Sequence, residues 1–132
     1  MSKFTLALAA TLALTAGIAD AQTFRAENRV TVTGQGDGLF SVPSGSRYGA
    51  RGAWCAAADY AMDVLNARGN DRLYVRSPQT TNSGPVTFGL TPGNTTPTSV
   101  LGVSAALRDA GASLSVDHAF QFCYDTRLIN SR

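Results

Sequence analysis

The sequence predicts one exported domain of the α+β class, in which a small, mainly antiparallel sheet packs against one main helix and one disulfide cross-links the fold. Three observations support this prediction. Residues 1–21 have the composition of a secretory signal peptide. The chain has two cysteines, Cys55 and Cys123. One long amphipathic segment, 53–68, lies among short segments that alternate between apolar and polar residues.

The N-terminal segment contains the three parts of a signal peptide. A short start containing Lys3 precedes an apolar run over 4–16, and a small-x-small cleavage site follows at 19–21. The apolar run is shorter than the about 20 residues that a membrane span needs. We therefore expect a mature domain over 22–132, without a membrane anchor, in the periplasm or outside the cell.

The charge of the chain does not favour binding to nucleic acid. The formal net charge is +2, and Lys3 is the only lysine, so every later basic residue is an arginine. These arginines are spread along the chain and mostly have acidic neighbours. A nucleic-acid surface requires a denser basic stripe interleaved with aromatic residues. We therefore expect no nucleic-acid partner.

Two short strands are predicted near the start of the mature chain. Residues 30–33 alternate between valine and threonine, as in a strand with one buried face. The Gly-rich segment 35–38 marks a turn, and residues 39–42 form a second alternating run. The spacing predicts a hairpin across this turn.

The segment 53–68 is predicted to form the main helix, because it combines good helix formers with an apolar stripe of helical period. Gly69 is placed to end this helix, since glycine adopts the left-handed conformation without strain. Asp59 and Asp63 lie one turn apart on the opposite side, where we expect them to face solvent. The apolar stripe comprises Trp54, Cys55, Ala58, Ala61, Met62 and Leu65.

Two more alternating runs, 72–76 and 86–90, are predicted to form an antiparallel pair of strands. Their connection of about nine residues is too short for a crossover helix. A further hypothesis is a small inhibitor of another secreted protein. Its contact is expected in the polar loops 77–84 and 91–99, because binding residues concentrate in loops.

The C-terminal part predicts a short helix and a long strand. Residues 100–110 fit a short helix that ends at Gly111 and is capped by Thr98 or Ser99. Residues 114–124 alternate over their whole length, so a long terminal strand is the first choice.

A strand that turns helical near Asp117 is the alternative for this segment. Ala119 and Cys123 are four residues apart, so a helix would place them on one face. A regular strand would instead place Cys123 on the face opposite the aromatic side chains.

Cys55 takes part in two mutually exclusive hypotheses. A disulfide between Cys55 and Cys123 is the default for an exported chain with an even number of cysteines. In the alternative, Cys55 is a nucleophile, His118 is its base and Asp125 orients the imidazole ring. A helix N-terminus favours the thiolate form of a nearby cysteine, which would suit such a nucleophile.

The enzyme hypothesis agrees with a resemblance to a known family. The Gly-Ala-Trp-Cys at 52–55, followed by Asp-Tyr-Ala at 59–61, resembles the nucleophile helix of transglutaminase-like cysteine enzymes. The His-Ala-Phe at 118–120 resembles the His-Ala-Trp strand of the same family. This resemblance implies acyl transfer or amide hydrolysis by Cys55 with His118, although the Asp-aromatic-Ala group follows the cysteine more closely in that family.

A longer part of the chain is similar to small exported bacterial proteins of uncharacterised function. The residues concerned are Trp-Cys-Ala-Ala-Ala-Asp-Tyr-Ala at 54–61, Arg-Leu-Tyr-Val at 72–75 and Val-Thr-Phe at 86–88. This similarity implies a shared fold and export, and it implies no activity or site.

We therefore expect a non-enzymatic exported module that binds a protein or a component of the cell envelope, with the Cys/His enzyme as the alternative. One histidine and two distant cysteines do not have the spacing of a zinc site. No metal or other cofactor is predicted.

Overall fold

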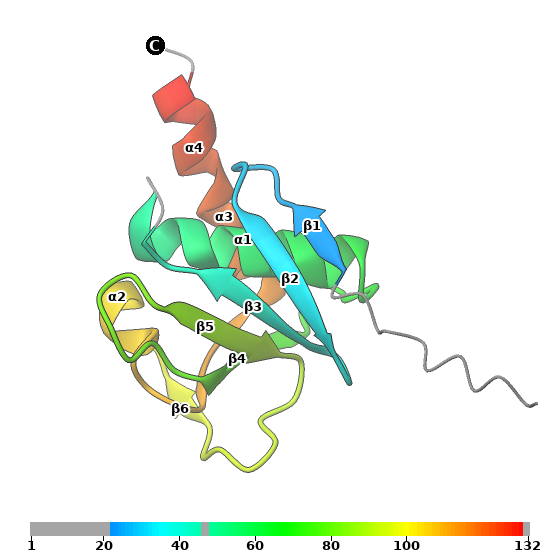
Figure 1. Cartoon of the computed structure of the whole chain (residues 1–132), viewed down its shortest axis with the longest axis vertical. Coiled ribbons are helices and arrows are strands. Elements are labelled where there is room, and N and C mark those ends of the chain that lie inside the picture. The colour runs from blue at the N-terminus through cyan, green and yellow to red at the C-terminus, as the bar shows by residue number, and fades with distance from the viewer. Residues whose placement is uncertain (1–21, 46–47, 131–132) are drawn as a thin grey trace, which may run out of the picture.

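The computed structural model describes residues 22–45 and 48–130, and the expected signal peptide, 1–21, lies outside the described residues. The described chain forms a seven-stranded sheet in the order β1-β2-β3-β5-β4-β7-β6, with helices packed against it (Figure 1). The elements are β1 (Thr23–Arg25), β2 (Thr31–Gly36), β3 (Leu39–Pro43), α1 (Gly49–Asp63), β4 (Arg72–Ser77), β5 (Pro85–Gly89), β6 (Thr98–Ser99), α2 (Val103–Ala106), β7 (Ala112–Ser115), α3 (Val116–Gln121) and α4 (Cys123–Asn130).

The α+β class and the mainly antiparallel sheet are confirmed. All neighbouring strands of the described sheet run antiparallel except β6, which pairs with β7 in parallel. The predicted hairpin forms between β2 and β3, with Gly34 opposite Phe40 and a bulge between Gly34 and Gly36. The predicted pair β4–β5 also forms. The strands β1 and β6, which the sequence did not predict, are short edge strands.

The core lies between the sheet and α1. The Trp54 ring packs edge-on against Phe88 at 5.0 Å between centroids, and its indole N–H donates to the carbonyl oxygen of Val103 at 3.4 Å. Trp54 is therefore a core residue whose polar atom has a partner. The sheet contributes fully buried side chains from Val32, Phe40, Val42, Leu73, Val75, Val86 and Phe88.

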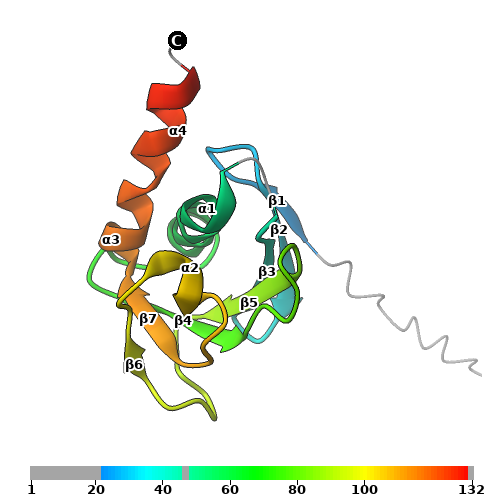
Figure 2. The same cartoon turned by 90° about the vertical axis from the view of Figure 1, so that its left-hand side faces the viewer.

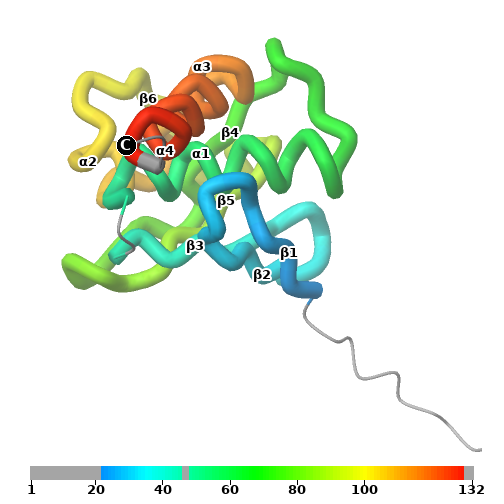
Figure 3. The backbone as a smooth tube through the Cα atoms, turned by 90° about the horizontal axis from the view of Figure 1, so that it is seen from above, coloured from blue at the N-terminus to red at the C-terminus, as the bar shows by residue number. Residues whose placement is uncertain are grey.

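Helix α1 is covered on two opposite sides. Figures 2 and 3 show strands β1–β3 on one side of α1 and helices α3 and α4 on the other. All residues from Gly52 to Ala61 are buried as a result. The prediction that Asp59 faces solvent is wrong, because Asp59 is only 9% exposed, whereas Asp63 is exposed as expected.

The bounds of α1 differ from the predicted segment 53–68. The helix begins at Gly49 and ends at Asp63, with Val64 as the C-cap residue. Gly69 does not end the helix. A side chain at Gly69 would overlap the Asp117 carboxylate, and the Gly69 carbonyl accepts a hydrogen bond from the Asp117 backbone at 2.9 Å. Gly69 thus permits the close approach of the loop after α1 to the start of α3.

The prediction of a long terminal strand over 114–124 is wrong. The alternative prediction, a strand that becomes helical near Asp117, is confirmed. Strand β7 ends at Ser115, whose hydroxyl accepts a hydrogen bond from the His118 backbone N–H at 3.1 Å. This N-cap contact satisfies a free N–H group of α3 and starts the helix. The predicted helix over 100–110 is also shorter, because only Val103–Ala106 is α-helical and Gly102 is its N-cap residue.

Thr98 and Ser99 do not cap a helix. They form β6, which lies beside Ala112 and Ser113 of β7. Within the described ranges, no helix is long and apolar enough to cross a membrane.

Candidate functional site

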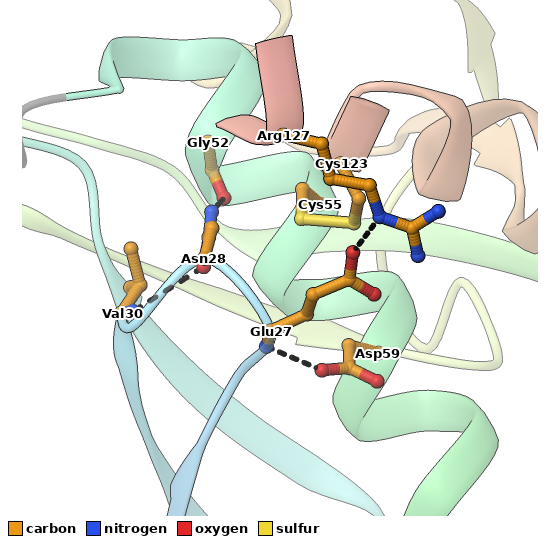
Figure 4. The surroundings of a disulfide bond; sticks show 8 residues. All are labelled: Glu27, Asn28, Val30, Gly52, Cys55, Asp59, Cys123 and Arg127. Atoms are coloured by element: carbon orange, nitrogen blue, oxygen red, sulfur yellow. Dashed lines mark hydrogen bonds and ion pairs between the residues drawn. A yellow bond between two sulfur atoms is a disulfide. The ribbon is translucent and has the colours of Figure 1, made fainter. Parts of the chain in front are cut away.

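Cys55 of α1 and Cys123 at the start of α4 form a disulfide, as predicted (Figure 4). Their Cα atoms are 5.0 Å apart, and both residues are fully buried. The bond closes a loop with a sequence separation of 68 residues. In the chain-entropy model, a disulfide that closes a loop of this size stabilises the fold by about 4 kcal/mol, because it restricts the unfolded chain.

The two cysteines meet because α3 and α4 pack closely on α1. Ala119 and Cys123 are one helical turn apart and both are fully buried. On α1, Cys55 is followed by Ala56, Ala57 and Ala58, which are fully buried as well. Small side chains allow the helices to approach each other, so that the Cys55 and Cys123 side chains can span the gap.

The alternative catalytic residues have other partners in this oxidised protein. The Cys55 sulfur is bonded to Cys123 and is not a thiolate. Asp125 forms an ion pair with Arg51 at 3.0 Å, and the exposed His118 ring lies 5.7 Å from the Phe122 ring. Among the described residues, no hydrogen bond or ion pair joins His118 to Asp125. The Cys/His enzyme therefore remains a prediction for a reduced chain.

Beside the disulfide, Glu27 connects three parts of the fold (Figure 4). Its backbone N–H donates to the Asp59 carboxylate at 2.7 Å, and its own carboxylate pairs with the Arg127 guanidinium. Glu27 lies in the loop between β1 and β2, Asp59 in α1 and Arg127 in α4. The loop thereby holds α4 next to α1.

The pKa of Asp59 is raised above its ordinary value. The main cause is burial, which disfavours the charged carboxylate. The negative charges of Asp63 and Glu27 raise the pKa further, while the hydrogen bond from the Glu27 backbone opposes the shift. An acidic group thus lies in the interior without a cation as its direct partner among the described residues.

Asn28 fixes the same loop to the first turns of α1, and sequence reasoning did not identify it. Its fully buried side-chain amide donates to the Gly52 carbonyl at 2.8 Å and accepts from the Val30 backbone at 3.2 Å. A local pattern cannot predict this role, because Gly52 is 24 positions away in the sequence.

Helix α4 carries three exposed apolar side chains. Figures 1 and 2 show that α4 extends beyond the body of the domain. The exposed fractions are 50% for Tyr124, 68% for Leu128 and 49% for Ile129. We call these three residues the α4 surface. Among the described residues, five large apolar side chains are exposed, and three of them form this surface.

The α4 surface borders a hollow of about 370 Å³ between α4 and the start of α1. Leu128 and Ile129 line this hollow together with Phe122. The Arg51 guanidinium lies over the Phe122 ring at 4.9 Å from its centroid, and Arg127 lies over Tyr124 at 4.8 Å. The region therefore has an apolar centre and charged edges, which is the usual arrangement of a protein-binding surface.

The predicted contact loops 77–84 and 91–99 are mainly polar where they are exposed. In the first loop, the Asn82 side chain accepts a hydrogen bond from Arg108 at 2.6 Å. Neither loop contributes a large exposed apolar side chain to the described surface. The exposed large apolar side chains lie instead on α4, at Leu101 after the second loop and at Val64 after α1.

Comparisons of the chain with protein-family models, curated proteins and solved structures find no match. The two resemblances of the sequence therefore stay predictions. Among the described residues, no three His, Cys, Asp or Glu side chains gather in a way that could hold a metal ion.

Proposed function

We propose that this protein is an exported, non-enzymatic binding module that contacts a protein of the cell envelope through the α4 surface. The observation that carries the proposal is the exposure of Tyr124, Leu128 and Ile129 on one short helix. Exposed apolar side chains that gather in one place mark interaction sites in stable proteins.

The attachment of α4 supports this proposal. The disulfide holds the first residue of α4 to α1, and the ion pairs Arg51–Asp125 and Glu27–Arg127 hold its following turns. A helix positioned in advance loses less conformational entropy when it binds. The attachment therefore favours recognition by α4 as a rigid element.

Site-specific photocrosslinking in the original host tests the proposal. A photoreactive phenylalanine at position 128 replaces an exposed residue, so we expect the domain to fold. Irradiation should give one covalent adduct with an envelope protein, and Ile129→Glu in the same chain should remove it, since a charge opposes burial of the surface.

The matched control carries the photoreactive residue at Thr80, an exposed position in the loop 77–84. We expect no adduct there. Absence of an adduct at position 128, or an adduct at position 80 alone, would refute the α4 surface as the binding site.

A further inference from the structure

A second hollow lies at the opposite end of α1, away from the α4 surface. It has a volume of about 820 Å³ and lies between the β2–β3 hairpin and the C-terminal end of α1. We call it the hairpin cavity. Its wall includes Thr33, Gly34 and Leu39 from the hairpin and Tyr60 from α1. No side chain that lines it carries a charge.

Tyr60 brings a buried polar atom to this cavity. The residue is 5% exposed, and its ring packs against Phe40 at 4.4 Å and against Phe24 at 5.7 Å between centroids. The hydroxyl oxygen lies over Gly34, where a Cβ atom would be only 2.7 Å away. Glycine at position 34 thus leaves room for the hydroxyl at the cavity wall.

The Tyr60 hydroxyl has no hydrogen-bond partner among the residues that the structure describes. Buried hydroxyl groups in folded proteins nearly always have one. Since no protein group pairs with the hydroxyl, its hydrogen bond goes to whatever occupies the cavity, either water or the acceptor atom of a ligand that replaces the water. The hydroxyl is therefore placed to recognise an acceptor atom inside the cavity.

The other lining residues limit the chemistry of the ligand. Leu39, Val64 and Leu65 provide apolar contacts, and Gln35 provides an amide. The lining side chains offer a charged ligand no opposite charge in exchange for its lost hydration. An uncharged ligand with an apolar part and one acceptor group fits this wall, as in most small-molecule sites.

We propose that the hairpin cavity binds a small uncharged molecule that carries a carbonyl group. The Tyr60 hydroxyl donates to the carbonyl oxygen, while Leu39, Val64 and Leu65 contact the apolar part. This site is separate from the α4 surface and does not depend on the function proposed for it.

Benzamide is a suitable probe, because it joins a neutral carbonyl group to an apolar ring. Titration of the mature protein, followed by nuclear magnetic resonance, should shift the backbone amides of Gly34, Gly36 and Gly38 in a saturable way. We expect a dissociation constant in the millimolar range, as a molecule of this size allows. Benzoate, which has the same shape and a negative charge, should not saturate these shifts when the N-terminal amino group of Gln22 is acetylated.

Tyr60→Phe should weaken benzamide binding by about tenfold, because it removes the donor and leaves the ring contacts intact. Tyr74→Phe is the matched control, since Tyr74 lies on β4 outside this cavity. Its affinity should equal that of the wild type. No saturable shift with benzamide, equal binding of benzoate, or unchanged affinity in Tyr60→Phe would overturn the proposal.

Val64→Arg provides a second test at a site that is 37% exposed, so it leaves the core in place. The new cation at the cavity wall should allow benzoate to bind and produce saturable shifts at the same glycines. If benzamide binds the wild type but the affinity for benzoate does not increase in Val64→Arg, the ligand is not held in the hairpin cavity.

Discussion

The Glu27 backbone N–H donates a hydrogen bond of 2.7 Å to the carboxylate of Asp59, which joins the loop after β1 to the interior side of α1. The accepting carboxylate is only 9% exposed. One amide donor does not replace the hydration that the carboxylate loses on burial, so the pKa of Asp59 is raised.

Asp59→Asn should stabilise the protein at pH 7. Because the folded-state pKa of Asp59 lies above 3.8, the native state binds the proton more tightly than the unfolded state does. The stability from protonated Asp59 is complete below pH 3.8 and is lost as the pH rises through the folded-state pKa. Asparagine keeps an acceptor for the Glu27 N–H without the charge, and denaturant unfolding between pH 3 and pH 8 measures the difference.

The gain from Asp59→Asn should disappear toward pH 3, where the wild-type carboxyl is neutral. Asp109→Asn serves as the control, because Asp109 is exposed, does not contribute to the pKa shift of Asp59, and its substitution should change stability less. A loss of stability for Asp59→Asn at pH 7 would show that the charge itself supports the fold.

Removal of the disulfide should destabilise the domain by about 4 kcal/mol in the chain-entropy model. The double variant Cys55→Ala/Cys123→Ala measures this loss by denaturant unfolding. Intact mass after alkylation of the denatured protein should show no reactive thiol until a reductant is added. Two reactive thiols without reductant would contradict the disulfide and make the enzyme with Cys55, His118 and Asp125 the leading hypothesis.

Asn28→Ala should destabilise the protein by about 2 kcal/mol, because the Gly52 carbonyl and the Val30 N–H both lose a partner. Thermal or denaturant unfolding measures this change. Asn28→Asp is the informative comparison, since it keeps the acceptor for Val30 but places a carboxylate oxygen against the Gly52 carbonyl. If both variants were as stable as the wild type, the amide would not hold the loop to α1.

Ser115→Ala should cost about 1 kcal/mol, the typical value for the loss of a helix N-cap. The hydroxyl of Ser115 accepts from the His118 N–H, so its removal leaves that donor unpaired at the start of α3. Ser115→Asp should retain most of the stability, because aspartate caps helices well. Equal losses in both variants, measured by chemical unfolding, would indicate that packing and not capping starts α3.

Local patterns predicted the elements whose shape depends on neighbouring residues. The hairpin around 35–38 follows from glycine turn chemistry between two alternating runs, and the pair β4–β5 follows from a short connection. The disulfide partners follow from cysteine number and expected export. Each of these inferences needs only nearby residues or the composition of the chain.

The alternation over 114–124 shows where such patterns fail. Apolar residues at every second position describe a strand, yet Ala119 and Cys123 also share one face of a helix. The Ser115 cap and the packing of Ala119 on α1 decide between the two, and the second is a contact between distant segments. Asn28 and Tyr60 likewise acquire their roles from the distant residues Gly52 and Gly34.

The sequence by itself determined the class of the fold, the main helix, two strand pairs and the cysteines that join. Only the tertiary structure decided which polar groups are buried and which apolar groups remain exposed. An apolar stripe in the sequence predicts that one face of a helix is buried, but it does not indicate whether a second layer also buries the other face. Helices α3 and α4 supply that second layer, in which Leu128 stays at the surface, and the loop with Glu27 contacts the buried Asp59.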